Sequence, residues 1–387
     1  MNRVKEWMKM SKKWQYIENN IEEARKIAER YNISFLIAQI IANKKLSDEK
    51  IKVFLEPTRE NFYDPFLLPD MEKAVDRIIK AIEKKEKVVI FGDYDVDGIT
   101  STTVLKKFLE ERNLEVGYYI PNRLKQGYGL NKEAIKQIVD EGCTLMITVD
   151  CGISGIEDVD YANSLGIDTI VTDHHEPLDI LPNGIAVVDP KIEESKYPFR
   201  ELAGVGVVFK LIQGLSIKLG LDAKENLKYL DLVCLGTISD IVPLVDENRV
   251  ITKLGLKLIE THRNLGLRYL IEACGFKKIN SGLVSFGIAP RINACGRMGF
   301  AEDALKLFIT DDMKNIKELT NKLNEYNRKR QETEKRIIEE AIKEIEEGNL
   351  NKQNIIILSR EGWHHRSNWN CVFKNNRYVF KTKYIAL

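Results

Sequence analysis

Short apolar runs alternate with helix-length amphipathic segments between residues 87 and 189. The apolar runs predict five strands, and the segments between the first four runs predict three helices. A strand–helix alternation of this kind is typical of repeated βαβ units, which build a parallel sheet. The expected strands are 88–91, 116–120, 145–149, 169–172 and 186–188, and the expected helices are 100–112, 132–141 and 155–165. The pattern therefore predicts an α/β fold.

The flanking regions follow a helical pattern. Residues 21–31 are amphipathic, a second helix is expected after Ser47, and a third at 71–85. Residues 311–347 form a charge-dense run with an apolar stripe, which predicts one long helix joining two domains. The apolar run at 354–358 predicts a strand that opens a further domain. A partner helix in a coiled coil is the alternative for the long helix, but its stripe breaks at Arg330.

Acidic residues follow the predicted strands. Asp93, Asp95 and Asp97 come directly after the first strand, and single acids end three others: Asp150, Asp173 and Asp189. The carboxyl ends of parallel strands meet at one edge of a sheet, where ligands bind. Three carboxylates within five residues repel one another unless a positive charge lies among them, and a divalent metal ion is the usual one.

The acidic cluster has three alternative interpretations. A calcium-binding EF-hand loop needs a glutamate at its twelfth position, which is Val104 when counted from Asp93. Such a loop also follows a helix, whereas a strand is expected here. A phosphatase-type nucleophilic aspartate after a strand remains an alternative, as does a plain acidic turn.

Two further groups extend the candidate site. Adjacent histidines, His174 and His175, follow the fourth strand together with Asp173. The apolar segment 231–244 contains Asp231 and Asp240 as its only charges, and one of them is expected to face the metal because an unpaired buried acid is costly.

Carboxylates mixed with imidazole suit manganese or magnesium better than zinc. A pair of ions needs about six or seven protein ligands with one bridging carboxylate. The predicted ligands are Asp93, Asp95, Asp97, Asp150, His174 and Asp240, with Asp150 as the bridge. Metal-assisted hydrolysis of a phosphodiester or a phosphoanhydride is the reaction class that this set indicates.

Composition narrows the picture. The net charge of +1 gives no general attraction to nucleic acid, so any basic surface must be local. The six cysteines include no C-x-x-C pair, which argues against a zinc knuckle or a disulfide framework and fits the cytoplasm. No apolar stretch is long enough to cross a membrane, and the N-terminus lacks the apolar core of a secretion signal.

Two small-residue segments were also considered. Residues 289–299 place Arg291, Asn293 and Arg297 among glycine and alanine, which suits phosphate contact, with an ordinary surface loop as the alternative. The glycines at 204 and 206 are too few for a dinucleotide-binding fingerprint, so helix packing is the expected role of that segment.

Four segments, in order, resemble the motifs of the DHH phosphoesterase superfamily: VVIFGDYDVDGITST, TVDCGISG, VTDHHEP and GTISDIVPL. Four more resemble the RecJ family of single-stranded-DNA exonucleases: FLEPTRENFYDPFLLPDMEKAVDRI, LAGVGVVFKL, APRINACGRMG and NEYNRKRQETEKRI. The resemblance covers nearly all of residues 15–365. It implies a 5′→3′ exonuclease of DNA recombination and repair that uses two Mn²⁺ or Mg²⁺ ions and releases mononucleotides from single-stranded DNA.

The resemblance also implies roles for individual residues. The metal ligands would be Asp95, Asp97, Asp150, His174 and Asp240, with Asp93 among or beside them. His175 would contact the scissile phosphate and, with Asp150, act in catalysis. Arg291, Asn293 and Arg297 would lie near the substrate.

The resemblance divides the chain into five parts. They are a helical lead-in (1–70), a DHH catalytic domain (71–310), a connecting helix (311–348), the incomplete start of a DHHA1-type domain (349–365) and an aberrant tail (366–387). A narrow passage between the two domains would admit one strand only.

The tail departs from the family. Its first six residues can be spelled by the codons AGG-AGT-AAT-TGG-AAT-TGT, and the same letters shifted by one base would read Gly-Val-Ile-Gly-Ile-Val, the glycine-rich motif that the resemblance implies. We therefore expect an out-of-frame tail and reduced processivity.

The alternatives at this stage are a small-substrate phosphodiesterase, acting on oligonucleotides or cyclic dinucleotides, a pyrophosphatase, and a non-catalytic scaffold. Expected partners are single-stranded DNA and a helicase or single-strand-binding protein. The chain is expected to act as a monomer away from membranes.

Overall fold

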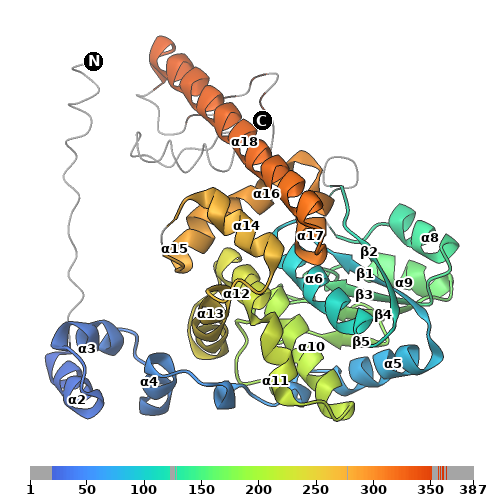
Figure 1. The fold of residues 1–387 in the computed structure, drawn as a ribbon, viewed down its shortest axis with the longest axis horizontal. Helices are drawn as coiled ribbons and strands as arrows, with labels where there is room; N and C mark the ends of the chain where they lie inside the picture. Colours follow the sequence, from blue (N-terminus) through green and yellow to red (C-terminus); the bar gives the residue numbers. More distant parts are fainter. Residues whose placement is uncertain are drawn as a thin grey trace. The chain divides into compact units, whose positions relative to one another are not determined.

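The computed structural model describes residues 20–122, 129–276 and 278–350, together with a few single positions. Figure 1 shows the ribbon coloured along the sequence. The chain divides into two units, one of residues 52–327 and one that combines the N-terminal and C-terminal parts. The predicted strand at 354–358, the start of the second domain at 349–365 and the tail at 366–387 lie almost wholly outside the described residues.

A five-stranded parallel sheet forms the centre of the larger unit (Figure 1). The strands are β1 (Lys87–Gly92), β2 (Glu115–Tyr119), β3 (Leu145–Val149), β4 (Asp168–Thr172) and β5 (Ala186–Val188). Their order across the sheet is β2-β1-β3-β4-β5, so the chain reverses its direction of progress beside β1. In open α/β sheets the carboxyl end at such a reversal is where ligands bind. The predicted α/β fold and all five strands are confirmed.

Helices cover both faces of the sheet. Side chains alternate along β1, because successive residues of a strand point to opposite faces. Val88 and Ile90 join one apolar core with α5, α6 and α10, while Val89 and Phe91 join a second core with α8 and α9. The bounds are α5 (Met71–Lys84), α6 (Val96–Glu110), α8 (Lys132–Asp140), α9 (Ile156–Ser164) and α10 (Gly204–Lys218). Helix α6 begins four residues before its predicted start.

A helical region completes the larger unit. Helix α12 of this region is almost wholly buried and ends beside the acidic loop that follows β1. A π-helical turn, Val284–Ile288, runs directly into α16, so residues 289–298 form a helix rather than a surface loop. The remaining bounds are α11 (Ala223–Asn226), α12 (Leu230–Ser239), α13 (Asp246–Ile259), α14 (Leu265–Cys274), α15 (Ser281–Leu283), α16 (Ala289–Met298) and α17 (Ala301–Ile309).

A buried ion pair fastens the segment before α5 to the core. Lys210 of α10 and Glu247 of α13 are both almost fully buried, with Nζ 3.0 Å from Oε1. Lys210 also donates to the carbonyl of Tyr63 (2.6 Å), and the N–H of Tyr63 donates to Glu247 (2.9 Å). The Tyr197 hydroxyl binds the other oxygen of Glu247. Every strong polar group here has a partner, as burial requires.

The other unit is helical where it is described. Helix α2 (Ile21–Tyr31) packs against α3 (Phe35–Ala42), and α4 (Asp48–Leu55) follows. Helix α18 (Met313–Glu347) is the long helix predicted from the sequence, and only its residues from 328 onward belong to this unit. Its second half packs Ile337 and Ala341 against Trp363 in a small apolar cluster. None of the helices in the described part of the chain combines the length and apolar character needed to cross a bilayer.

Candidate metal centre

The acidic loop after β1 is folded tightly around Asp95. This residue is the N-cap of α6, and its Oδ1 accepts the N–H groups of Asp97 (2.9 Å) and Gly98 (3.1 Å). Position 98 admits no side chain, because a Cβ there would lie 2.4 Å from the carbonyl oxygen of Asp93. Because Asp95 caps the helix through these two N–H groups, α6 starts at Val96 rather than at the predicted residue 100.

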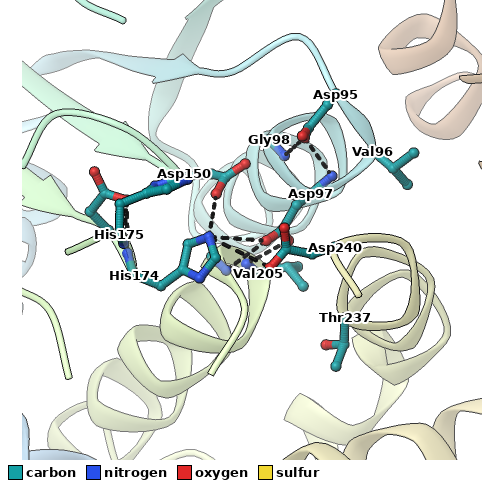
Figure 2. Close-up of polar contacts among 12 residues, drawn as sticks. Asp95, Val96, Asp97, Gly98, Asp150, His174, His175, Val205, Thr237 and Asp240 are labelled. Carbon is teal, nitrogen blue, oxygen red and sulfur yellow. Dashed lines mark hydrogen bonds and ion pairs between the residues drawn. The ribbon is translucent and has the colours of Figure 1, made fainter. Parts of the chain in front are cut away.

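Asp97 lies inside the molecule against the start of a second helix. Its carboxylate accepts the N–H of Gly204 (2.6 Å) and of Val205 (2.9 Å), the first residues of α10 (Figure 2). A helix N-terminus carries a partial positive charge and unpaired N–H groups, so it stabilises an anion there.

Asp150 ends β3 in a left-handed conformation, with φ of 59°. Residues other than glycine adopt this region at a cost, and such conformations cluster at functional sites. Its side chain lies against Gly204, where an added Cβ would come within 2.6 Å of Oδ1. Gly204 thus contributes both an N–H group for Asp97 and the space for Asp150. Sequence reasoning missed this role and assigned the glycine to helix packing.

His174 is buried among the carboxylates (Figure 2). Its Nε2 lies 3.1 Å from Oδ1 of Asp150, 3.7 Å from Oδ2 of Asp240 and 3.9 Å from Oδ2 of Asp97. Asp240 is the C-cap of α12 and has a side chain that is only 21% exposed. Of the two acids in that apolar segment, Asp240 is the one that faces this group.

Asp173 forms hydrogen bonds with both histidines and belongs to none of the groups of possible metal ligands described below. Its Oδ1 accepts the N–H of His174 (2.8 Å) and lies 2.7 Å from Nδ1 of His175, while Oδ2 accepts the N–H of Ile153 (2.9 Å). The contact with Nδ1 fixes the orientation of the His175 ring. Asp189 is also buried, but one of its oxygens accepts the N–H of Lys191 (2.7 Å).

Burial and mutual repulsion dominate the electrostatics. Burial raises the pKa of Asp97 well above its usual range, and Asp240 and Asp95 add to the effect. The pKa of Asp150 is likewise raised well above normal by burial and by its neighbouring aspartates. Burial lowers the pKa of His174, which favours the neutral ring that binds metals. The hydrogen bond to Asp173 raises the pKa of His175.

The residues fit a divalent metal. Three donor groups have ligand atoms within 4.8 Å of one another: Asp93 with Asp95 and Asp150, Asp97 with His174 and Asp240, and Asp150 with both histidines. Asp150 is shared by two of them. Its buried Oδ1 and the Nε2 of His174 lie 3.1 Å apart but make no hydrogen bond of normal geometry among the described residues. A cation bound to both of these ligand atoms would satisfy them. A cavity of about 380 Å³ opens over the group.

The predicted substrate-binding residues lie on α16, beside the acidic loop. Asn293 accepts the N–H of Val96 (3.3 Å), and a Cβ at Gly296 would meet the carbonyl oxygen of Tyr94 at 2.3 Å. Arg291 instead donates to the carbonyl of Gly287 (2.6 Å) and to Asn324 (2.6 Å). Its guanidinium therefore joins the π-helical turn to α18. Arg297 lies in the last turn of α16 and is half-buried.

Comparison with known proteins places this geometry in a family. The model of the DHH family, N-terminal domain, matches residues 87–237, which span the sheet and most of the donor groups. The single-stranded-DNA-specific exonuclease RecJ of Bacillus subtilis is 39% identical over 354 residues, 91% of this chain and 44% of the relative. The chain therefore spans about half the length of the curated relatives that it matches.

Solved structures agree. The crystal structure of exonuclease RecJ bound to manganese has a TM-score of 0.74 and 33% identity, and the match covers 81% of this chain and 79% of that one. RecJ of Thermus thermophilus in complex with Mn²⁺ has a TM-score of 0.81 and 29% identity, over 94% of this chain and 52% of that one. The chain belongs to the RecJ family of DHH proteins.

Proposed function

We propose that this chain hydrolyses phosphodiester bonds of single-stranded DNA from the 5′ end, with two Mn²⁺ or Mg²⁺ ions. The observation that carries the proposal is Asp150, which is shared between donor groups on two sides of the buried cluster. A shared carboxylate is the mark of a paired-metal site for in-line phosphoryl displacement. The relatives support the substrate, since those with this fold are named as single-stranded-DNA-specific exonucleases.

The ligands follow from the donor groups. Asp93 and Asp95 would hold one ion with Asp150, and Asp97, His174 and Asp240 would hold the other, again beside Asp150. When bound, such ions lower the pKa of a water molecule and neutralise charge on the phosphoryl oxygens. The chain's own contribution is to fix the donors: Asp95 through the cap of α6, Asp97 through the start of α10, and Asp150 through its left-handed turn.

His175 would contact the scissile phosphate. It lines the cavity over the acids, and Asp173 grips its other ring nitrogen. In the reaction, water attacks the phosphorus, the bond to the 3′ oxygen of the terminal nucleotide breaks, and that oxygen takes up a proton. The products are a mononucleotide and a strand shorter by one residue.

The proposal that the substrate is a long strand rather than a small molecule rests on the names of the relatives. The basic cluster at 328–330 gives little independent support, because Arg330 pairs with Glu334 (2.9 Å) and Arg328 faces Glu332 (4.0 Å). Charges paired one turn apart along a helix are partly neutralised. The five-part domain division, the role in recombination and repair, the helicase or single-strand-binding partner, the monomeric state and the cytoplasmic location stay predictions.

A digestion experiment tests the proposal. A single strand labelled at its 5′ end, the same strand labelled at its 3′ end, its duplex and a dinucleotide are incubated with the chain and Mn²⁺, with and without a chelator. We expect mononucleotide release from the 5′ label only, no cutting of a blunt duplex and no activity with chelator. Faster hydrolysis of the dinucleotide than of the strand would favour a small-substrate phosphodiesterase, and no hydrolysis at all would favour a scaffold.

A further inference from the structure

A second cavity lies at the same edge of the sheet as the metal centre. It has a volume of about 260 Å³ and is lined by the residues that follow β2 and by the junction of α16 and α17. The lining residues used below are Asn122, Gly296, Phe300, Glu302, Asp303 and Lys306. Gly296 also packs on the backbone of Tyr94, between Asp93 and Asp95. The cavity is therefore a direct neighbour of the acidic loop, although no role proposed above uses it.

An aromatic stack forms one wall. Phe300 and Tyr326 have ring centroids 5.0 Å apart and planes that differ by 4°. The Tyr326 hydroxyl donates to Asp303 (3.0 Å), which fixes the supporting ring. Phe300 is nevertheless 47% exposed, so its second face is open although the first is covered. A large apolar ring held by a neighbour and exposed beside a cavity is a ready stacking surface.

The charges of the cavity select against phosphate. Lys306 is paired with Glu302 at 2.6 Å, which cancels the only positive charge among the lining residues. Asp303 accepts a hydrogen bond from the Tyr326 hydroxyl, and the lining residues hold two carboxylates but one ammonium group, so the wall carries a net negative charge. A phosphate would be repelled there, whereas a nucleobase is flat and uncharged, and its amino groups can donate to carboxylates.

We propose that this cavity binds a nucleobase of the strand, stacked on the open face of Phe300. The proposal rests on the proposed function, because the base belongs to a strand whose backbone passes the neighbouring acids. Stacking on a protein ring is tolerant of sequence, since every base has a π face. The cavity would thus hold the strand in register with the metal centre without reading its sequence.

Equilibrium binding of a modified strand tests the proposal. The probe is a 5′-phosphorylated single strand with non-hydrolysable linkages and 2-aminopurine at one of its first positions in turn. In the wild type, one position should lose fluorescence on binding, because stacking quenches this base. Phe300→Ala and Phe300→Leu should abolish that quenching and weaken binding about fivefold or more. Phe300→Trp, which keeps a ring face, should retain both.

Phe300→Leu separates the loss of stacking from a loss of local packing, because leucine keeps an apolar side chain against Tyr326. Phe286→Ala is the matched control, since it removes a phenylalanine that is 81% exposed and lies outside the cavity. Unchanged affinity and fluorescence in Phe300→Ala would overturn the inference, and so would an equal loss in Phe286→Ala. A wild type that neither binds nor cuts any single strand would instead overturn the proposed function, and the inference with it.

Discussion

The carboxylate of Asp97 accepts the N–H of Gly204 at 2.6 Å, which joins the first turn of α6 to the first turn of α10. The two residues are more than 100 positions apart in the chain, yet they set the shape of one site. Gly204 also lies against Asp150, where it leaves room for the carboxylate. A residue with no functional side chain therefore positions two of the proposed ligands.

Gly204→Ala should lower manganese affinity and activity by about 10- to 100-fold, as is typical for residues that support metal ligands. The new Cβ would lie 2.6 Å from Oδ1 and 2.7 Å from Cβ of Asp150, so this side chain must move. Manganese titration and strand hydrolysis measure the change. Gly206→Ala is the control in the same turn, because the nearest atoms to its Cβ would belong to the Leu202 side chain, the closest at 3.3 Å. Equal losses in both variants would argue against a special role for Gly204.

Asp150→Asn should remove the stabilisation that manganese gives to the fold. A ligand that binds only the folded state raises the melting temperature. The wild-type melting temperature should rise with added Mn²⁺, and that of the variant should stay constant. Without metal the variant should melt no lower than the wild type, because the substitution removes one charge from a buried group of mutually repelling aspartates. Asp160→Asn, at an exposed position, should respond like the wild type. A full metal response in Asp150→Asn would contradict the assignment.

Asp173→Asn and His175→Ala should both reduce the turnover number, because each removes a correctly oriented His175 ring from the site. Asp173 holds Nδ1 of His175, so it serves by positioning the ring. Each single variant should lose about 100-fold in kcat, and the double variant little more than either one. Steady-state kinetics of the wild type, the two single variants and the double variant give the coupling energy between the two residues. Losses that multiply would show that the two residues act independently.

Much of this architecture could be predicted from the sequence. The five strands are short, fully apolar runs, so their positions were clear, and the acids that follow them fall at one edge because the sheet is parallel. The start of α6 was set too late, because the capping role of Asp95 is visible only when its carboxylate is seen to accept two N–H groups.

Contacts between residues far apart in the chain could not be predicted from the sequence. Nothing local distinguishes Gly204 from a glycine used for helix packing, since its importance comes from Asp97 and Asp150 in distant segments. Arg291 stays a predicted substrate residue, but its Nε and Nη1 donate to the side chain of Asn324 and the carbonyl of Gly287, and nothing in the sequence indicated these contacts. The stack of Phe300 on Tyr326 likewise depends on how α17 meets α18.

Lys210→Met should destabilise the larger unit by about 3–5 kcal/mol, because it leaves Glu247 as a buried charge without its cation. Both side chains are almost completely buried. Urea unfolding of both proteins measures the difference. Lys322→Met removes one member of an exposed pair with Glu318 and should change stability by less than about 0.5 kcal/mol. Similar effects of the two substitutions would contradict the special position of Lys210.

Glu86 should contribute stability that disappears in acid. Burial alone would raise its pKa, but the hydrogen bonds from Arg77 and Thr144 outweigh burial and lower the pKa below 4.5. A carboxylate with a lowered pKa stabilises the fold above its unfolded pKa and loses that contribution as pH falls through the folded value. The wild type should therefore be more stable than Glu86→Gln at neutral pH, and the gap should close below about pH 4. A gap that is constant with pH would contradict this account.

The central claim is that six side chains form one metal-dependent site that cuts DNA. Its most direct test compares the wild type with Asp95→Asn on a 5′-labelled single strand over a range of Mn²⁺ concentrations. Asparagine caps a helix as well as aspartate does, so the variant should fold normally while losing a charged ligand. We predict mononucleotide release that saturates with manganese in the wild type and is abolished in the variant. Equal release by the two proteins, or release that persists in chelator, would contradict the account.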